Sequence, residues 1–224
     1  MTSGIVFVLL PAGTFTMGAQ GNDTDGANYV EGVNSDEGPP HRVTLAPFFL
    51  ARHELTRGQW RRLGGVEDLR LYTGDDTYPV ADVDWFACDA LLRSRGLTLP
   101  TEAQWEYGCR AGTTTPWWTG IDEESVRSEV EDLRPVGNRV ANAFGLFNVH
   151  GNVEEWCADR FWPYSRPWRQ GDGLRLGAVG VSPFHVLRGG AWGSRHTRSA
   201  RRNNLPPASR GANTGVRAAR TLQP

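Results

Sequence analysis

Hydrophobic residues occur along the chain in short runs that are separated by polar and glycine-rich stretches. The runs Ile5–Leu10 and Thr14–Met17 flank the turn sequence Pro11-Ala12-Gly13 and predict two strands joined as a hairpin. Residues 18–40 show no periodicity and predict a long loop, of a length at which loops are usually functional or disordered. The stretch Arg42–Leu50 alternates and then ends apolar, which predicts a third strand.

Three segments repeat their apolar residues at spacings of three and four, as a helix does: 55–63, 84–96 and 101–112. The second starts at an aspartate, which is a common capping residue. In the third, the side chains of Thr101 and Gln104 are spaced so that each can bond the other's exposed backbone amide. We therefore expect two to three short helices.

The last third of the chain contains three strand-like runs and one long polar segment. Gly151–Cys157 alternates like a strand, and Val186–Trp192 and Gly215–Ala219 are short apolar runs that contain glycine. Between the last two, residues 193–213 carry almost no large aliphatic side chains and are rich in Gly, Asn, Ser, Pro and Arg. This composition predicts a surface loop that is held by a strand on each side.

The length and composition favour one α+β domain. No linker-like run divides the 224 residues, and a chain of this length can bury a large core, so we expect a single domain over 1–224. Nine Trp and nine Phe supply bulky anchors for that core, and we expect Trp156 and Trp192 to be buried in it. A few helices among many short strands, without β-α-β alternation, indicate the α+β class.

Charge and hydropathy limit the partners and the location. The formal net charge of −1 gives no sign of a nucleic-acid or membrane partner, although all 24 basic residues are arginine. The apolar run at the N-terminus has only six residues, too few for a signal peptide or a membrane span. We expect synthesis in the cytoplasm and no membrane insertion, and the sequence leaves open whether the protein then lies on a virion or at the cell surface.

The cysteines and histidines do not show the spacing of a metal site. Cys88, Cys109 and Cys157 lack Cys-x-x-Cys spacing, and we interpret them as buried free thiols. The histidines are scattered along the chain and are not expected to be metal ligands: His41, His53, His150, His185 and His196.

Taken in order, several stretches resemble the formylglycine-generating-enzyme (sulfatase-modifying factor) domain family, and they cover nearly the whole chain. The matching stretches are Pro11–Gly18, Asp36–Val43, Glu54–Thr56, Tyr78–Val80, Val83–Trp85, Leu99–Tyr107, Phe144–Phe147, Gly151–Cys157, Leu187–Trp192, Arg198–Ala200 and Gly215–Arg217. The resemblance implies a C-type-lectin-like fold. In that fold the two ends of the chain pair in a short antiparallel sheet, and much of the rest is irregular.

The chain lacks one feature of the enzymes of this family, a pair of metal-binding cysteines. Those enzymes bind copper through two cysteines shortly after an Arg-Gly-Gly motif, and here no cysteine follows Cys157. Thiolates are the soft ligands that copper(I) prefers, so we expect no copper. A second branch of the family, the ergothioneine-type sulfoxide synthases, binds iron through a histidine set of a separate N-terminal helical domain. The histidines of this chain are scattered without such spacing, so we expect no iron either. An oxidoreductase or sulfatase-modifying factor with an atypical metal site stays as the alternative, and a structural accessory domain is a third interpretation.

A third branch of the family looks closer: the variable proteins of diversity-generating retroelements, whose C-terminal segment is rewritten by adenine-directed mutagenesis. Asparagine codons mutated in this way yield the small polar residue types that fill this segment, although the same types also fill ordinary loops. The resemblance implies a variable region over about 186–220 and a ligand-binding set that comprises Gly193, Ser194, His196, Arg201, Asn203, Asn204, Ser209, Gly211, Ala212 and Asn213. Interspersed residues resemble the fixed positions of that branch: Arg198, Ser199, Ala200, Arg202, Arg210 and Gly215.

A four-residue match implies a calcium site. Asn148, Gly151, Val153 and Glu155 match a calcium-binding stretch of the formylglycine-generating enzymes, where a side-chain amide, two main-chain carbonyls and a carboxylate supply oxygen ligands. The alternative interpretation is that Asn148 and Glu155 bond backbone amides and hold the turn without a metal.

The arginines of the C-terminal segment are expected to fix it to the scaffold. With 25 acidic residues in the chain, we interpret most of these arginines as partners of carboxylates. They are Arg188, Arg198, Arg202, Arg210 and Arg217. The sequence thus favours a non-enzymatic protein that binds a protein ligand through a face of small polar residues, with Arg195 and Arg201 as candidate anchors.

Overall fold

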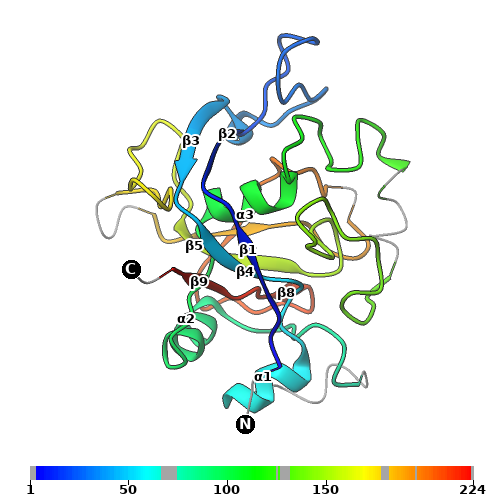
Figure 1. Cartoon of the computed structure of the whole chain (residues 1–224), viewed down its shortest axis with the longest axis vertical. Helices are drawn as coiled ribbons and strands as arrows, with labels where there is room; N and C mark the ends of the chain where they lie inside the picture. Colours follow the sequence, from blue (N-terminus) through cyan, green and yellow to red (C-terminus); the bar gives the residue numbers. More distant parts are fainter. Residues whose placement is uncertain are drawn as a thin grey trace.

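The computed structural model describes residues 4–66, 75–124, 126, 132–177, 182–194 and 196–222. Within these ranges the chain forms short strands, three short helices and long connecting segments, in an α+β arrangement (Figure 1). No helix among the described residues combines the length and the hydropathy that crossing a bilayer requires.

The first four strands form one long bent hairpin. β1 (Phe7–Leu10) pairs antiparallel with β4 (Phe48–Ala51), and β2 (Gly13–Met17) pairs antiparallel with β3 (His41–Leu45). The prediction that the first two runs pair with each other was therefore wrong. Both strands exist, but their partners come from beyond the 18–40 loop, which contains only the short 3-10 helix η1 (Ser35–Glu37).

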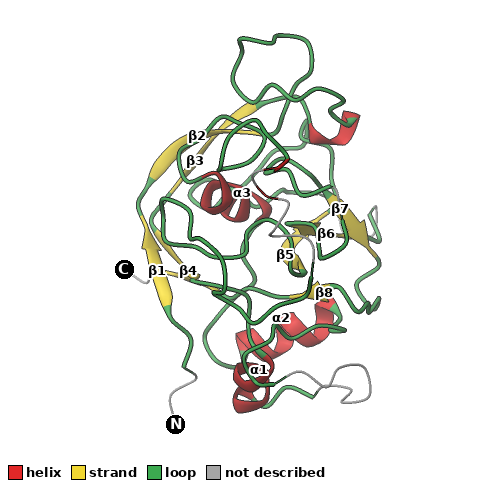
Figure 2. Cartoon of the chain, turned by 90° about the vertical axis from the view of Figure 1, so that its right-hand side faces the viewer, coloured by secondary structure: helices red, strands yellow, loops and turns green. Residues whose placement is uncertain are grey.

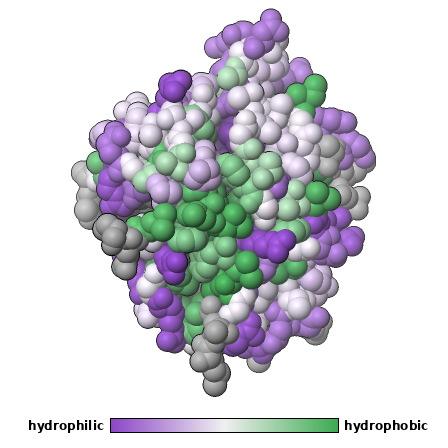
Figure 3. All heavy atoms as spheres, viewed as in Figure 1, coloured by the Kyte–Doolittle hydropathy of each residue, from purple (hydrophilic) through white to green (hydrophobic). Residues whose placement is uncertain are grey.

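The two ends of the chain lie in the same sheet, as the resemblance implied. β9 (Ala219–Thr221) pairs with β4, and the strand order β1-β4-β9 places β4 between the N-terminal and C-terminal strands. Apolar side chains gather on the outer surface over this sheet (Figure 3), where Leu9 is 52% exposed.

The three predicted helices are confirmed: α1 (Arg57–Leu63), α2 (Trp85–Arg93) and α3 (Glu102–Arg110). In α3 the Thr101 side chain accepts from the Gln104 amide, and the Gln104 side chain accepts from the Thr101 amide. The same reciprocal pair opens α1, and an aspartate caps α2. Such pairs satisfy amides that have no partner within the helix, which is why these three starts could be predicted locally.

A four-stranded sheet in the order β7-β6-β5-β8 carries the C-terminal segment. Its strands are β5 (Glu154–Arg160), β6 (His185–Arg188), β7 (Asn203–Leu205) and β8 (Thr214–Gly215), of which β8 pairs parallel with β5. The predicted 193–213 loop is therefore interrupted by β7, which pairs with β6 as an edge strand. α3 packs between this sheet and the β2–β3 pair (Figure 2).

The expectation for one of the two tryptophans was wrong. Trp156 on β5 is fully buried, but 41% of Trp192 is exposed. β6 ends at Arg188, and Gly189 and Gly190 then turn the chain with φ values of +98° and +67°. Trp192 therefore follows a turn and does not continue the alternation of a strand. The prediction for the three cysteines is confirmed, since all are free and buried.

Candidate functional site

Two buried glutamates on one face of α3 anchor the C-terminal segment. Glu102 and Glu106 are one helical turn apart and have no exposed surface. Glu102 accepts hydrogen bonds from Arg202 at 2.6 and 2.8 Å, in the bidentate geometry that fixes a guanidinium in position. Glu106 accepts from Arg188 and, at 2.8 Å, from Arg110. The face of α3 thus binds two arginines that flank the segment after β6.

The opposite charges in this cluster keep each other ionised. Burial alone would raise the pKa of Glu106, but the guanidinium groups of Arg110 and Arg188 outweigh it, and the pKa is lowered. Burial also acts to lower the pKa of Arg202, but the Glu102 carboxylate outweighs it and the pKa is raised. A buried charge without its partner would cost several kcal/mol, so these residues depend on each other.

The other three arginines also pair with carboxylates, which confirms the interpretation of all five. Arg198 donates to the buried Glu37 at 2.8 Å, and Arg210 pairs with Asp84 at 2.7 Å on the surface. Arg217 is fully buried and binds Glu155 at 2.7 Å. The segment between β6 and β9 is therefore joined to the scaffold at several widely separated points.

Exposed and buried residues alternate within this segment. Every residue of the predicted ligand set is at least partly exposed, whereas the neighbouring Ser199, Ala200 and Arg202 are buried. The turn that begins the segment requires glycine, because a Cβ on Gly190 would lie 2.7 Å from the His196 carbonyl oxygen. Arg195 lies outside the described residues.

Five residues of the predicted ligand set line one small cavity of about 190 Å³. Its lining comprises Glu154, Ala191, Ser194, His196, Arg201, Asn203 and Asn213. Glu154 on β5 is not part of the predicted set; Asn203 donates to both of its carboxylate oxygens at 2.9 Å, and burial raises its pKa. The polar groups of β5 and β7 therefore meet at this cavity.

The remaining members of the set do not line this cavity: Gly193, Asn204, Ser209, Gly211 and Ala212. Asn204 follows Asn203 directly on β7 and pairs with Val186 of β6. Successive side chains of a strand alternate, so the Asn204 side chain points to the face opposite Asn203. Ser209 and Gly211 lie in turns, where their amides bond Pro206 and Thr214. The predicted set is thus one exposed stretch of chain with a single concave part.

The glutamates were not singled out by the sequence, although a signal existed. Glu102, Glu106 and Cys109 share one helical stripe by their spacing of four and three. Carboxylates on a stripe that faces the core are stable only with cationic partners, and the chain supplies arginines. Glu37 lies in a loop without periodicity, and no local pattern indicates it.

The two side chains of the predicted calcium site, those of Asn148 and Glu155, are bonded to protein groups in this structure. Each oxygen of the Glu155 carboxylate accepts two hydrogen bonds, three in all from Arg217 and one from Trp105 at 2.7 Å. Asn148 accepts the amide of Gly137 through its side-chain oxygen. A carboxylate with filled lone pairs beside a guanidinium has no position for a second cation.

Calcium binding stays a prediction, and chelation tests it. On this geometry we expect an excess of chelator to leave the melting temperature of the purified protein unchanged, because Arg217 already neutralises Glu155. Differential scanning calorimetry before and after dialysis against EDTA measures it. A drop in melting temperature that calcium restores and magnesium does not would mean that Glu155 leaves Arg217 to bind the metal.

The three cysteine thiols and the His150 imidazole are buried. Burial raises the pKa of Cys109 to about 12, and burial lowers the pKa of His150 to about 3. Metal binding requires the thiolate form, which this environment disfavours. Among the described residues, no group of three or more His, Cys, Asp or Glu is placed to hold a metal ion.

The sequence is similar to one family of domains and to several longer proteins. Residues 2–222 match the family described as the Sulfatase-modifying factor enzyme 1-like domain. The formylglycine-generating enzyme of Streptomyces coelicolor is 34% identical over 185 residues, which cover 71% of this chain and 57% of that enzyme. The serine/threonine-protein kinase pkn1 of Chlamydia caviae is 29% identical, over 89% of this chain and 37% of the kinase. The chain therefore spans less than two thirds of the length of either relative.

Two solved structures share the fold along their full length. PvdO from Pseudomonas aeruginosa superposes with a TM-score of 0.78 at 27% identity, over 99% of both chains. Treponema denticola variable protein 1 superposes with a TM-score of 0.77 at 20% identity, over 99% of this chain and 98% of that chain. These likenesses establish the C-type-lectin-like α+β fold that was predicted from the sequence motifs.

Proposed function

The chain belongs to the sulfatase-modifying factor enzyme 1-like domain family, and within this family we propose that it is a non-enzymatic ligand-binding protein. Its ligand would be another protein, which contacts the exposed residues of the segment 193–213. The proposal follows the resemblance of the sequence to the variable proteins of diversity-generating retroelements. Treponema denticola variable protein 1 has the same fold as this chain.

One observation carries the proposal. In this segment the residues that bind the scaffold and the residues that are exposed to solvent are different residues. Arg188 and Arg202 bind buried glutamates of α3, and Arg198 binds Glu37. The side chains of the predicted ligand set reach solvent, whereas Thr197, Ser199 and Ala200 are buried among them. A binding surface of this kind tolerates changes in its exposed side chains, because its backbone is fixed by residues that do not change.

The chemistry of the exposed residues suits a protein ligand. Ser and Asn supply adaptable hydrogen bonds, and arginine is among the residues that dominate binding energies at interfaces. Arg201 is partly exposed at the cavity, and its guanidinium lies 3.9 Å from the Glu37 carboxylate. Such a distant pair leaves the guanidinium donors of Arg201 available to a partner.

The DNA that flanks the gene tests the retroelement assignment. We expect a reverse transcriptase gene and a near-copy of the last hundred or so coding bases, which differs from the gene only at adenines. Sequencing of the locus in several isolates should show changes concentrated in the codons of the exposed set. A locus without this copy, with an unchanged segment in every isolate, would contradict the assignment.

The alternative is an oxidoreductase or sulfatase-modifying activity, which the identity to the formylglycine-generating enzyme favours. We infer against it from the ligands: no cysteine follows Cys157, and the three cysteines are buried. The purified protein is incubated with copper(I), oxygen and a cysteine-containing sulfatase peptide. Oxygen consumption coupled to conversion of the peptide would establish the alternative, whereas an unchanged peptide supports the binding protein.

A further inference from the structure

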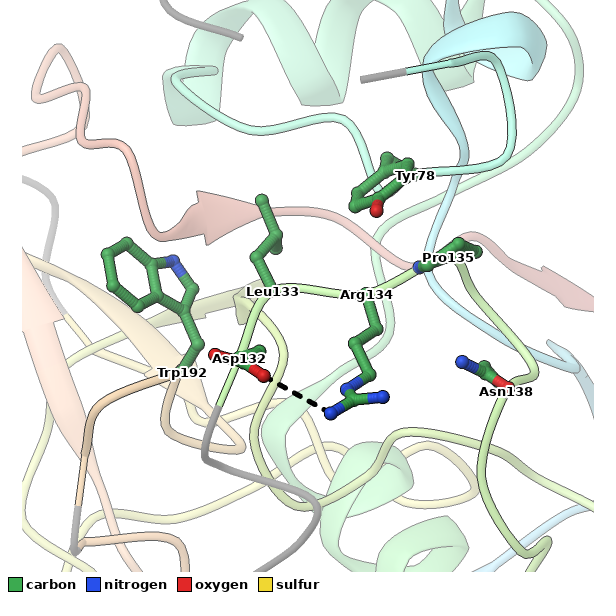
Figure 4. A pocket seen from close by; sticks show the side chains of 7 residues that line it. All are labelled: Tyr78, Asp132, Leu133, Arg134, Pro135, Asn138 and Trp192. Atoms are coloured by element: carbon green, nitrogen blue, oxygen red, sulfur yellow. Dashed lines mark hydrogen bonds and ion pairs between the residues drawn. The ribbon is translucent and has the colours of Figure 1, made fainter. Parts of the chain in front are cut away.

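A second and larger cavity lies beside the segment and is not lined by any residue of the predicted ligand set. Its volume is about 640 Å³, within the range of roughly 300–1,000 Å³ that is typical of small-ligand sites. The side chains around it are drawn in Figure 4: Tyr78, Asp132, Leu133, Arg134, Pro135, Asn138 and Trp192. Trp192 follows Ala191, which lines the smaller cavity, so the two cavities are neighbours across one turn.

One buried residue holds both walls of this cavity. Asn152 is 1% exposed and accepts the Arg134 amide through its side chain and the Trp192 amide through its carbonyl, each at 3.0 Å. Its own side-chain amide donates to the buried Glu54 at 3.0 Å. Since Trp192 and Arg134 are bonded to the same residue, their backbones keep a fixed separation, and the cavity exists before a ligand binds.

Residues 132–138 form the strip of chain that lines the cavity opposite Trp192, and this strip is fixed at two further points. The Val136 amide bonds the Thr77 carbonyl, and the Gly137 amide bonds the side chain of Asn148, each at 2.9 Å. Thr77 lies far along the chain from the other two holding residues, Asn148 and Asn152, so the strip is held from two different parts of the chain. The strip therefore belongs to the rigid scaffold, although it has no secondary structure of its own.

The side chains of the cavity combine an aromatic surface with planar polar groups. Trp192 is 41% exposed and lies at one end, while Asn138 lies at the other end with Arg134 between them (Figure 4). Arg134 and Asp132 form an ion pair at 3.1 Å, so their charges cancel. The side chains of Arg134 and Asp132 are 38% and 68% exposed, so both can reach a ligand. The cavity thus offers exposed polar groups and an aromatic face, and the charges of its described lining residues cancel.

We propose that this cavity binds a carbohydrate, with one sugar ring stacked on Trp192. The C–H groups on one face of a pyranose carry partial positive charge and pack against the negative face of an indole. Hydroxyls at the ring edge donate and accept together, and they match the carboxylate of Asp132, the amide of Asn138 and the guanidinium of Arg134.

Other ligand classes fit the cavity less well. A charged ligand gains little from a cavity in which Asp132 and Arg134, the acid and the base among its described lining residues, neutralise each other. A purely apolar ligand would remove Asp132 and Asn138 from water without replacing their hydrogen bonds. A neutral ligand with many hydroxyls and one apolar face can bond the polar side chains of the lining and pack against Trp192.

Saturation-transfer NMR with a panel of methyl glycosides tests the proposal. The panel comprises the α and β methyl glycosides of glucose, galactose, mannose and N-acetylglucosamine. We expect at least one to bind with a Kd near 1 mM, an affinity usual for a single small contact. Trp192→Ala should weaken this glycoside by at least about tenfold, and Trp192→Phe by less, because a phenyl ring still offers a face.

Phe86→Ala is the matched control, since Phe86 is 54% exposed and does not line the cavity. It should leave the Kd unchanged, and the melting temperature of each variant shows that it is folded. The carbohydrate site is overturned if no glycoside receives saturation, or if Trp192→Ala binds as tightly as the wild type. The result is independent of the proposed protein-binding face, because no residue of that face lines this cavity.

Discussion

Arg202→Met is expected to lower the free energy of unfolding by about 3–5 kcal/mol, because it removes the bidentate partner of the buried Glu102 carboxylate and leaves it the more distant Arg188, 3.6 Å away. Arg202 is 1% exposed, and besides Glu102 it bonds the Asp36 and Trp162 carbonyls, each at 3.0 Å. Chemical denaturation of wild type and variant measures the difference. Methionine keeps much of the packing against Tyr164, so the change reports mainly the lost charge and hydrogen bonds.

The surface pair in the same segment provides the control. Arg210→Met breaks an ion pair with Asp84 in which the arginine side chain is 54% exposed, and such pairs contribute about 1 kcal/mol or less. Adding Glu102→Gln to Arg202→Met should recover part of the loss, because no uncompensated charge is then buried. A loss in Arg202→Met no larger than in Arg210→Met would mean that the buried pair does not hold the segment.

Glu54→Gln is expected to remove much of the decline in stability between pH 5 and pH 8. Burial raises the pKa of Glu54 from 4.5 to about 8, Glu155 adds to the shift, and Arg217 opposes it. Between these values the folded state binds a proton at Glu54 that the unfolded state has lost. The free energy of unfolding therefore falls as pH rises, by at most about 1.4 kcal/mol per pH unit.

Denaturant titrations from pH 4.5 to pH 8.5 measure this slope. Glutamine accepts the same bond from Asn152, so the variant should match the wild type near pH 4.5 and be more stable at pH 8. Asp159, whose pKa burial raises to about 7, contributes in the same direction in both proteins and cancels in the difference. Glu31→Gln, at an exposed position, is the control for the loss of one carboxylate. Parallel slopes in Glu54→Gln and wild type would contradict the assignment.

The sequence predicted the helices because their signals are local. Thr101 and Gln104 belong to one turn of chain, and their pairing needs no distant partner. Strand pairing depends on residues far apart, so the chain's first two strands could be located but their partners could not. Pro47 separates β3 from β4, and the sequence pattern alone had merged these strands into one.

The sequence predicted which residues of the candidate site are exposed, but it did not predict all the residues that surround them. The alternation of small polar residues with Arg198, Ala200 and Arg202 indicated which side chains are exposed. Trp192 was misassigned because a tryptophan beside glycines is as compatible with a turn as with a strand. Glu154, which forms one wall of the smaller cavity, lies on β5 in a run that only indicated alternation.

The central claim is that a fixed backbone presents a surface whose side chains are free to change. A display library tests it most directly, with simultaneous randomisation of the exposed set: Gly193, Ser194, His196, Arg201, Asn203, Asn204, Ser209, Gly211, Ala212 and Asn213. A matched library randomises the buried Arg188, Ser199, Ala200 and Arg202. We predict that most members of the first library fold, with protease resistance near that of the wild type, and yield binders to unrelated proteins, while most of the second unfold. Equal loss of folding in both libraries, or a folded first library without binders, would contradict the account.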